Sequence, residues 1–112
     1  MDKNTQQRWF YTIIQTLPVR PTTKGTAQEQ WDAMAEDLIR QHNPNLTEGS
    51  FKVRRSNVRT LRHPLVEANM LYVVHYAAAT EHKSNFFKQA IEIATLIKNG
   101  KPFPRYEISA AA

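Results

Sequence analysis

A chain of 112 residues can enclose one hydrophobic core but not two, so we expect a single domain over residues 1–112, with residues 1–7 and 109–112 as flexible tails. The hydrophobic fraction of 41% argues for a folded globule rather than disorder, and the absence of cysteine excludes disulfides and cysteine-based metal or catalytic sites. The net charge of +5 favours a polyanionic partner, and it arises in residues 49–112, which carry ten cations against four acids.

No targeting or membrane segment is apparent. The first eight residues lack the apolar core of a signal peptide, and no later stretch approaches the ~20 apolar residues of a membrane span. We therefore expect a soluble, cytoplasmic protein without a membrane partner.

The first half of the chain predicts a strand followed by a helix. Residues 9–16 are rich in β-branched and aromatic side chains and are closed by Pro18, which favours a strand, and apolar residues at both parities indicate that it is central. A helix should follow over residues 26–42, because Thr26 and Glu29 fit a capping box and Pro44 ends the pattern. Its expected apolar stripe consists of Trp31, Met34, Ala35, Leu38 and Ile39.

The second half predicts two strands, a helix and a last strand. We expect a short strand over residues 51–56, a basic loop over 56–64 and a third strand over 69–77. The alternative for this third strand is a helix that begins at Pro64, with a stripe of Val66, Met70, Val73 and Ala77. Ser84 is a suitable cap for a helix that ends before Gly100, and residues 103–108 suit an edge strand. The stripe of this second helix would be Phe87, Ala90, Ala94 and Ile97, flanked by Phe86 and Ile93.

The order of these elements predicts an α+β, ferredoxin-like βαββαβ fold. In this arrangement a four-stranded antiparallel sheet carries two helices on one face. The first and third strands are central in this fold, and they are the apolar ones here. The agreement between strand position and strand composition supports the topology.

A basic run in the middle of the chain is the main candidate site. No acid lies between Glu48 and Glu67, while five cations do, namely Lys52, Arg54, Arg55, Arg59 and Arg62. Cations on an edge strand can simply prevent edge-to-edge pairing, but the loop arginines have no edge to protect and suit phosphate contacts. Trp9, Tyr72 and Tyr76 on an open sheet face could stack bases, although core packing explains such residues equally well.

Two hypotheses for function follow. The first is a small nucleic-acid-binding protein without catalytic activity, in which the basic run binds phosphates. The second is a protein-interaction module that docks on an acidic protein surface, through the cationic edge or the open sheet face. A homodimer through that face is a further reading. The four histidines lack metal-ligand spacing, and no catalytic or phosphate-loop motif is present, so we expect neither a cofactor nor an enzyme.

Overall fold

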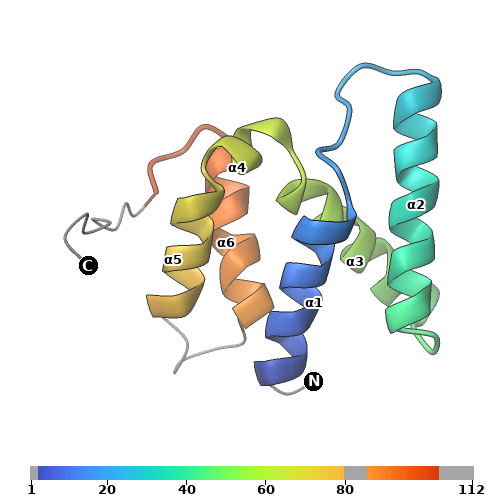
Figure 1. Cartoon of the computed structure of the whole chain (residues 1–112), viewed down its shortest axis with the longest axis horizontal. Helices are drawn as coiled ribbons and strands as arrows, with labels where there is room; N and C mark the ends of the chain where they lie inside the picture. The colour runs from blue at the N-terminus through green and yellow to red at the C-terminus, as the bar shows by residue number, and fades with distance from the viewer. Residues whose placement is uncertain (1–2, 80–85, 104–112) are drawn as a thin grey trace.

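The computed structural model describes residues 3–79 and 86–103, and all regular structure within these ranges is helical (Figure 1). Six helices follow one another in the described chain: α1 (Lys3–Thr16), α2 (Thr26–His42), α3 (Glu48–Leu61), α4 (Pro64–Ala68), α5 (Met70–Ala79) and α6 (Phe86–Lys98). Helix α1 begins inside the stretch that we expected to be an amino-terminal tail.

The ferredoxin-like prediction is wrong, because the described residues contain no strand and so no sheet. The expected strands at 9–16, 51–56 and 69–77 are helical, and α3 also covers most of the expected loop at 56–64. Residues 104–108 of the fourth strand lie outside the described residues, and Phe103 is not in regular structure. The residues buried along α1 and just beyond it, Trp9, Phe10, Ile13 and Leu17, recur at helical spacing, so one side of a helix presents them all to the core.

The alternative helix after Pro64 is correct in outline. Pro64 occupies the first turn of α4, where its missing N–H costs nothing, and a short break at Asn69 separates α4 from α5. Val66, Val73 and Ala77 of the proposed stripe are fully buried. Tertiary packing therefore overrides the strand propensity of the valine and tyrosine residues in this segment.

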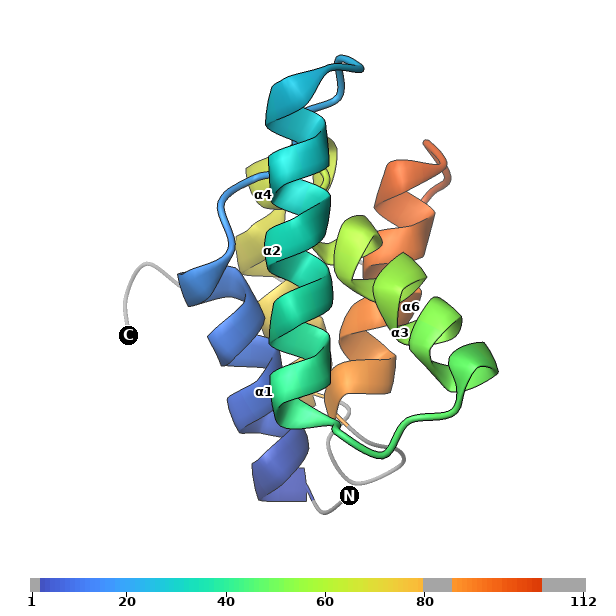
Figure 2. The ribbon, with the colours of Figure 1, turned by 90° about the vertical axis from the view of Figure 1, so that its right-hand side faces the viewer.

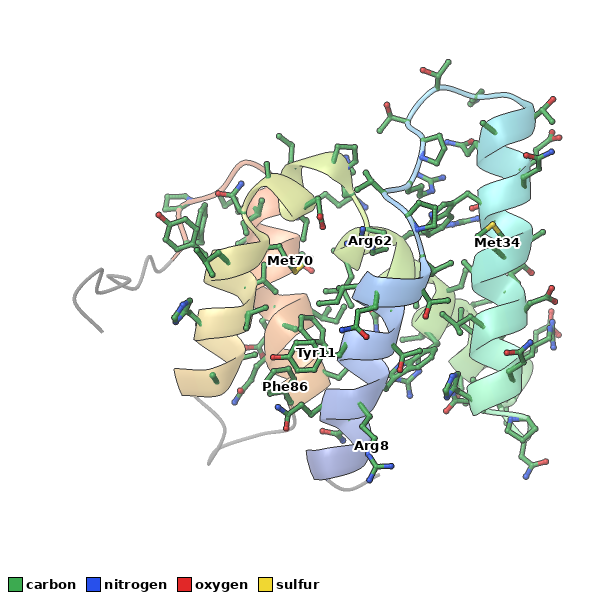
Figure 3. All side chains as sticks on the ribbon, viewed as in Figure 1. Arg8, Tyr11, Met34, Arg62, Met70 and Phe86 are labelled. Atoms are coloured by element: carbon green, nitrogen blue, oxygen red, sulfur yellow. The ribbon has the colours of Figure 1, made fainter. Side chains whose placement is uncertain are left out.

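Helix α6 lies at the centre of the fold and packs against α1, α3, α4 and α5 (Figure 1). Figure 3 shows Phe86 of α6 facing Tyr11 of α1, with ring centroids 6.0 Å apart. The predicted stop signal is confirmed, because Gly100 adopts a positive φ of 67° and Lys101 N–H donates to the Leu96 carbonyl, as in a Schellman motif. The predicted stripe of α6 is also confirmed, since all its members are buried: Phe86, Phe87, Ala90, Ile93, Ala94 and Ile97.

Helix α2 spans the predicted residues 26–42 and packs against α3 at one edge of the molecule (Figure 2). Two details of its prediction are wrong. Gly25 rather than Thr26 is the N-cap residue, with a φ of 152° that only glycine adopts easily, and no side chain caps this end. Met34 is 46% exposed, because α2 has a neighbour on one side only and needs a narrower apolar stripe.

The segment between α1 and α2, residues 17–25, is held down at several points, and we call it the strap. The indole N–H of Trp31 donates to the Pro18 carbonyl at 2.7 Å. The Nε–H of Arg62 donates to the Leu17 carbonyl at 3.0 Å, and the Arg20 N–H donates to the Arg62 carbonyl at 2.8 Å. Arg62 thus lies where α3 ends against the strap (Figure 3), and it joins parts of the chain 45 positions apart.

His63 makes the start of α4 sensitive to acid. Its Nδ1 accepts a hydrogen bond from the Leu65 N–H at 3.1 Å, which requires this ring nitrogen to be unprotonated. Burial, and then the positive charges of Lys98 and Arg20, lower the pKa of His63. Helix α4 is therefore capped by the neutral form of His63.

A pH dependence follows from the lowered pKa. The folded chain binds the His63 proton less readily than the unfolded chain, so this contribution to stability is complete above about pH 6.5 and is lost as the pH falls through the folded pKa. Between about pH 7.5 and pH 5 we expect the wild type to lose more of its free energy of unfolding than His63→Asn does, because the asparagine amide caps without titrating. Denaturant unfolding of both proteins measures this difference. Parallel pH profiles would contradict the role of His63.

Candidate functional site

Two arginines of the basic run face α2. Arg59 Nη2 lies 3.2 Å from Asp32 Oδ1, and Arg55 Nη1 lies 3.8 Å from Glu36 Oε1. The two acids are one helical turn apart on α2, and the two arginines are one turn apart on α3. Because the later arginine pairs with the earlier acid, α2 and α3 run antiparallel. We call this arrangement of paired charges the α2–α3 ladder. These two arginines are about one-third exposed, and each has a carboxylate partner, with Asp32 shared between Arg59 and Arg20.

The other two paired cations of the run sit in contrasting surroundings. Arg62 is only 4% exposed, and its Nη1 donates to Glu67 Oε2 at 2.6 Å. Lys52 is well exposed and forms a loose pair with Glu48, four residues earlier, at 3.8 Å. Four of the five residues predicted to bind phosphate therefore have a carboxylate partner, and burial removes Arg62 from the surface altogether.

Arg54 differs from the rest of the run. Its guanidinium carbon lies 5.0 Å from the ring centroid of Phe87 on α6, and no carboxylate within the described ranges comes within ion-pair distance. Burial lowers the pKa of Arg54, which nevertheless stays charged at neutral pH because the pKa of a guanidinium starts so high. Arg54 is thus a half-buried cation over Phe87, with no counter-charge among the described residues.

The structure does not bring the predicted stacking aromatics together with the basic run. Trp9 is 3% exposed and packs within the core, with its ring centroid 4.9 Å from that of His42. Tyr72 and Tyr76 are half-buried on α5, where Tyr72 contacts Phe103 and the Tyr76 hydroxyl donates to Glu92 at 3.5 Å. Helix α6 lies between α5 and α3 (Figure 1), so these tyrosines and the arginines of α3 belong to different sides of the molecule.

An open groove of about 680 Å³ lies between α3 and α6, and Arg54 lines it. Val53 and Asn57 of α3 and Lys88 and Ile91 of α6 also line this α3–α6 groove. Val53 is 62% exposed, more than the other exposed large apolar side chains of the described residues, Met34, Leu65 and Leu71. The described residues that line the groove include two cations and no acid.

Sequence reasoning missed Val53, Lys88 and Ile91. The sequence did carry a signal for Val53. It is an apolar residue among cations, and in a helix it cannot lie on the same face as the buried Phe51 and Val58. Lys88 and Ile91 could not be joined to it, because their place beside Val53 depends on how α6 packs against α3. Of the five cations of the basic run, Arg54 lines the α3–α6 groove, and the other four do not.

Other kinds of site find no support within the described parts of the chain. They hold no group of three or more histidines and carboxylates that could bind a metal ion. None of the helices between residues 3 and 98 is both long and apolar enough to cross a membrane. The α3–α6 groove is therefore the candidate site. No known protein family, no curated protein and no solved structure matches this chain.

Proposed function

We propose that this chain is a non-catalytic, cytoplasmic protein-interaction module that docks on another protein through the α3–α6 groove. The observation that carries this proposal is the exposed Val53 beside Arg54, in a groove that no described acid lines. A partner that supplies apolar surface and negative charge would cover the exposed Val53 and balance the charge of Arg54 beside it.

Three observations favour a protein partner over nucleic acid. Proteins that bind single strands combine a cationic track with exposed aromatic rings, whereas Trp9 is buried here and Phe87 is 5% exposed beneath Arg54. Phosphate binding by Arg55 and Arg59 would compete with the carboxylates of the α2–α3 ladder. The groove walls carry the apolar side chains of Val53 and Ile91, against which side chains of another protein can pack.

A binding experiment with nucleic acid tests this choice of partner. We expect the protein to bind a labelled single strand and a labelled duplex weakly at about 0.15 M salt, because four of the five cations of the basic run are paired with carboxylates. Fluorescence anisotropy across a salt series measures this, with Arg54→Met and Arg55→Met compared with the wild type. Tight binding that persists at this ionic strength and requires Arg54 would overturn the proposal and assign the groove to nucleic acid.

A selection experiment tests docking at the groove directly. A displayed library of random peptides is selected on the folded protein and depleted on Val53→Glu, which keeps a helix-forming residue at an exposed position. We expect peptides whose affinity falls by about tenfold or more on Val53→Glu, the size of one lost apolar contact plus a misplaced charge.

The matched control for this selection is Ser56→Glu. Ser56 is also exposed on α3, but it does not line the groove, and the substitution changes the net charge by the same amount. Selected peptides should bind Ser56→Glu as they bind the wild type. Recovery of no peptide that distinguishes the two variants would overturn docking at the groove.

A further inference from the structure

We infer that the occupant of the α3–α6 groove is an amphipathic helix with acidic residues beside its apolar stripe, supplied by the partner protein. This inference rests on the proposed function and adds the chemistry and shape of the segment that binds. It is carried by the form of the groove walls, by the fixed position of Arg54 and by the peptide-binding modes that the fold excludes.

Both walls of the groove are helical, and their lining residues follow helical spacing. On α3 they run from Gly49 through Val53 to Asn57, one turn apart, and on α6 Phe87 and Ile91 are one turn apart. The α3 wall from Gly49 to Asn57 extends for about 12 Å, or two turns. Two helices side by side present rows of side chains between which a third helix can pack. Apolar residues three or four positions apart on that third helix would contact Val53 and Ile91.

The positive charge in the groove indicates that the partner helix carries acidic residues. The Arg54 guanidinium lies over the Phe87 ring, 5.0 Å from its centroid, and a guanidinium in a cation–π contact can still donate to a carboxylate. At one end, the lining residues Gly49 and Ser50 belong to the first turn of α3, the positive end of its dipole.

The remaining peptide-binding modes lack the surface that they need. Sheet extension requires an exposed strand, and no strand exists in residues 3–79 or 86–103. Proline-rich segments dock on exposed aromatic rings, but the lone aromatic residue among the described groove lining, Phe87, is 5% exposed. A helix laid along the groove is the mode that these walls fit.

The experiment uses the peptides recovered by selection on the wild-type chain, synthesised and measured one at a time. We expect their sequences to share glutamate or aspartate placed three or four positions from leucine-like residues, and their circular dichroism to become more helical on binding. Arg54→Met, which keeps an aliphatic chain over Phe87, should weaken binding about tenfold, the size of a lost charge-assisted hydrogen bond. Arg55→Met should leave affinity within about twofold, because Arg55 faces Glu36 on the far side of α3.

A double-mutant cycle identifies the carboxylate that meets Arg54. Replacing the relevant peptide glutamate by glutamine should cost about tenfold on the wild type and little on Arg54→Met. Groove-dependent peptides that lack acids, or that bind in an extended form, would overturn this inference while leaving docking at the groove intact. If no peptide distinguishes Val53→Glu from Ser56→Glu, the proposed function itself fails.

Discussion

Replacing Trp31 with alanine is expected to lower the free energy of unfolding by about 3–5 kcal/mol. The ring is 2% exposed, its N–H donates to the Pro18 carbonyl and the Arg20 guanidinium lies 6.0 Å from its centroid. Alanine therefore leaves a cavity between α2 and the strap and also frees a backbone carbonyl. Because domains of this size are stable by about 5–15 kcal/mol in total, the variant should be close to unfolding at 25 °C.

Trp31→Phe separates the two parts of this effect. Phenylalanine retains most of the apolar surface but cannot donate to Pro18, so we expect a smaller loss of about 1–2 kcal/mol. Denaturant unfolding gives the free energies, and hydrogen exchange of the Arg20 amide, which donates to the Arg62 carbonyl, reports on the strap itself. Equal losses for the two variants would show that the hydrogen bond, rather than the buried ring, holds α2 against the strap.

Replacing Arg62 with methionine is expected to cost about 2–3 kcal/mol, although methionine fills much of the same space. The substitution leaves the Leu17 carbonyl without the donor that now lies 3.0 Å away. It also releases Glu67, but that side chain is 44% exposed and can be solvated. The expected loss thus comes mainly from the unpaired Leu17 carbonyl. Thermal or denaturant unfolding measures this loss.

Glu67→Gln provides the second arm of this test. It leaves the buried Arg62 guanidinium without a negative partner, so we expect a loss of about 1–2 kcal/mol despite the exposure of Glu67. In the double variant Arg62→Met with Glu67→Gln, the second change should cost almost nothing more, since the Arg62 guanidinium that Glu67 contacts is already gone. Additive losses would mean that the 2.6 Å contact contributes nothing to stability.

The sequence predicts α2 and α6 well because each carries its own signals. An apolar stripe at helical spacing is followed by a stop residue, Pro44 in one case and Gly100 in the other. These signals are local, so they do not depend on the rest of the fold. The N-cap of α2 is one residue earlier than predicted, because it is set by the backbone conformation of Gly25 and not by the Thr26 side chain.

The same reasoning fails for α1, α3 and α5, because there local propensity and packing disagree. Aromatic and β-branched residues favour strands by a margin of about 1 kcal/mol or less per residue, which burial of residues such as Phe10 and Ile13 against α6 easily exceeds. In the ferredoxin-like prediction the expected position of each strand agreed with its composition. The strands themselves, however, were assigned from residue types alone. Helical spacing within residues 9–17 was the stronger evidence.

The candidate site was predictable in part. Arg55 and Arg59 are four residues apart, and so are Asp32 and Glu36, a match that predicts two helices paired through their charges once α3 is taken as a helix. The isolation of Arg54 could not be predicted, because it depends on the approach of Phe87 from α6. Sequence therefore located the basic segment but not the residue within it that faces a groove.

The central position of α6 determines when this protein can fold during its synthesis. A ribosome completes α1 to α5 before it makes the helix against which α1, α3, α4 and α5 pack. Until that point Phe10, Val58 and Val73 lack the surface that covers them in the finished fold. A nascent chain that stops before Phe86 therefore exposes apolar residues that the finished fold buries, and exposed apolar surface of this kind favours aggregation.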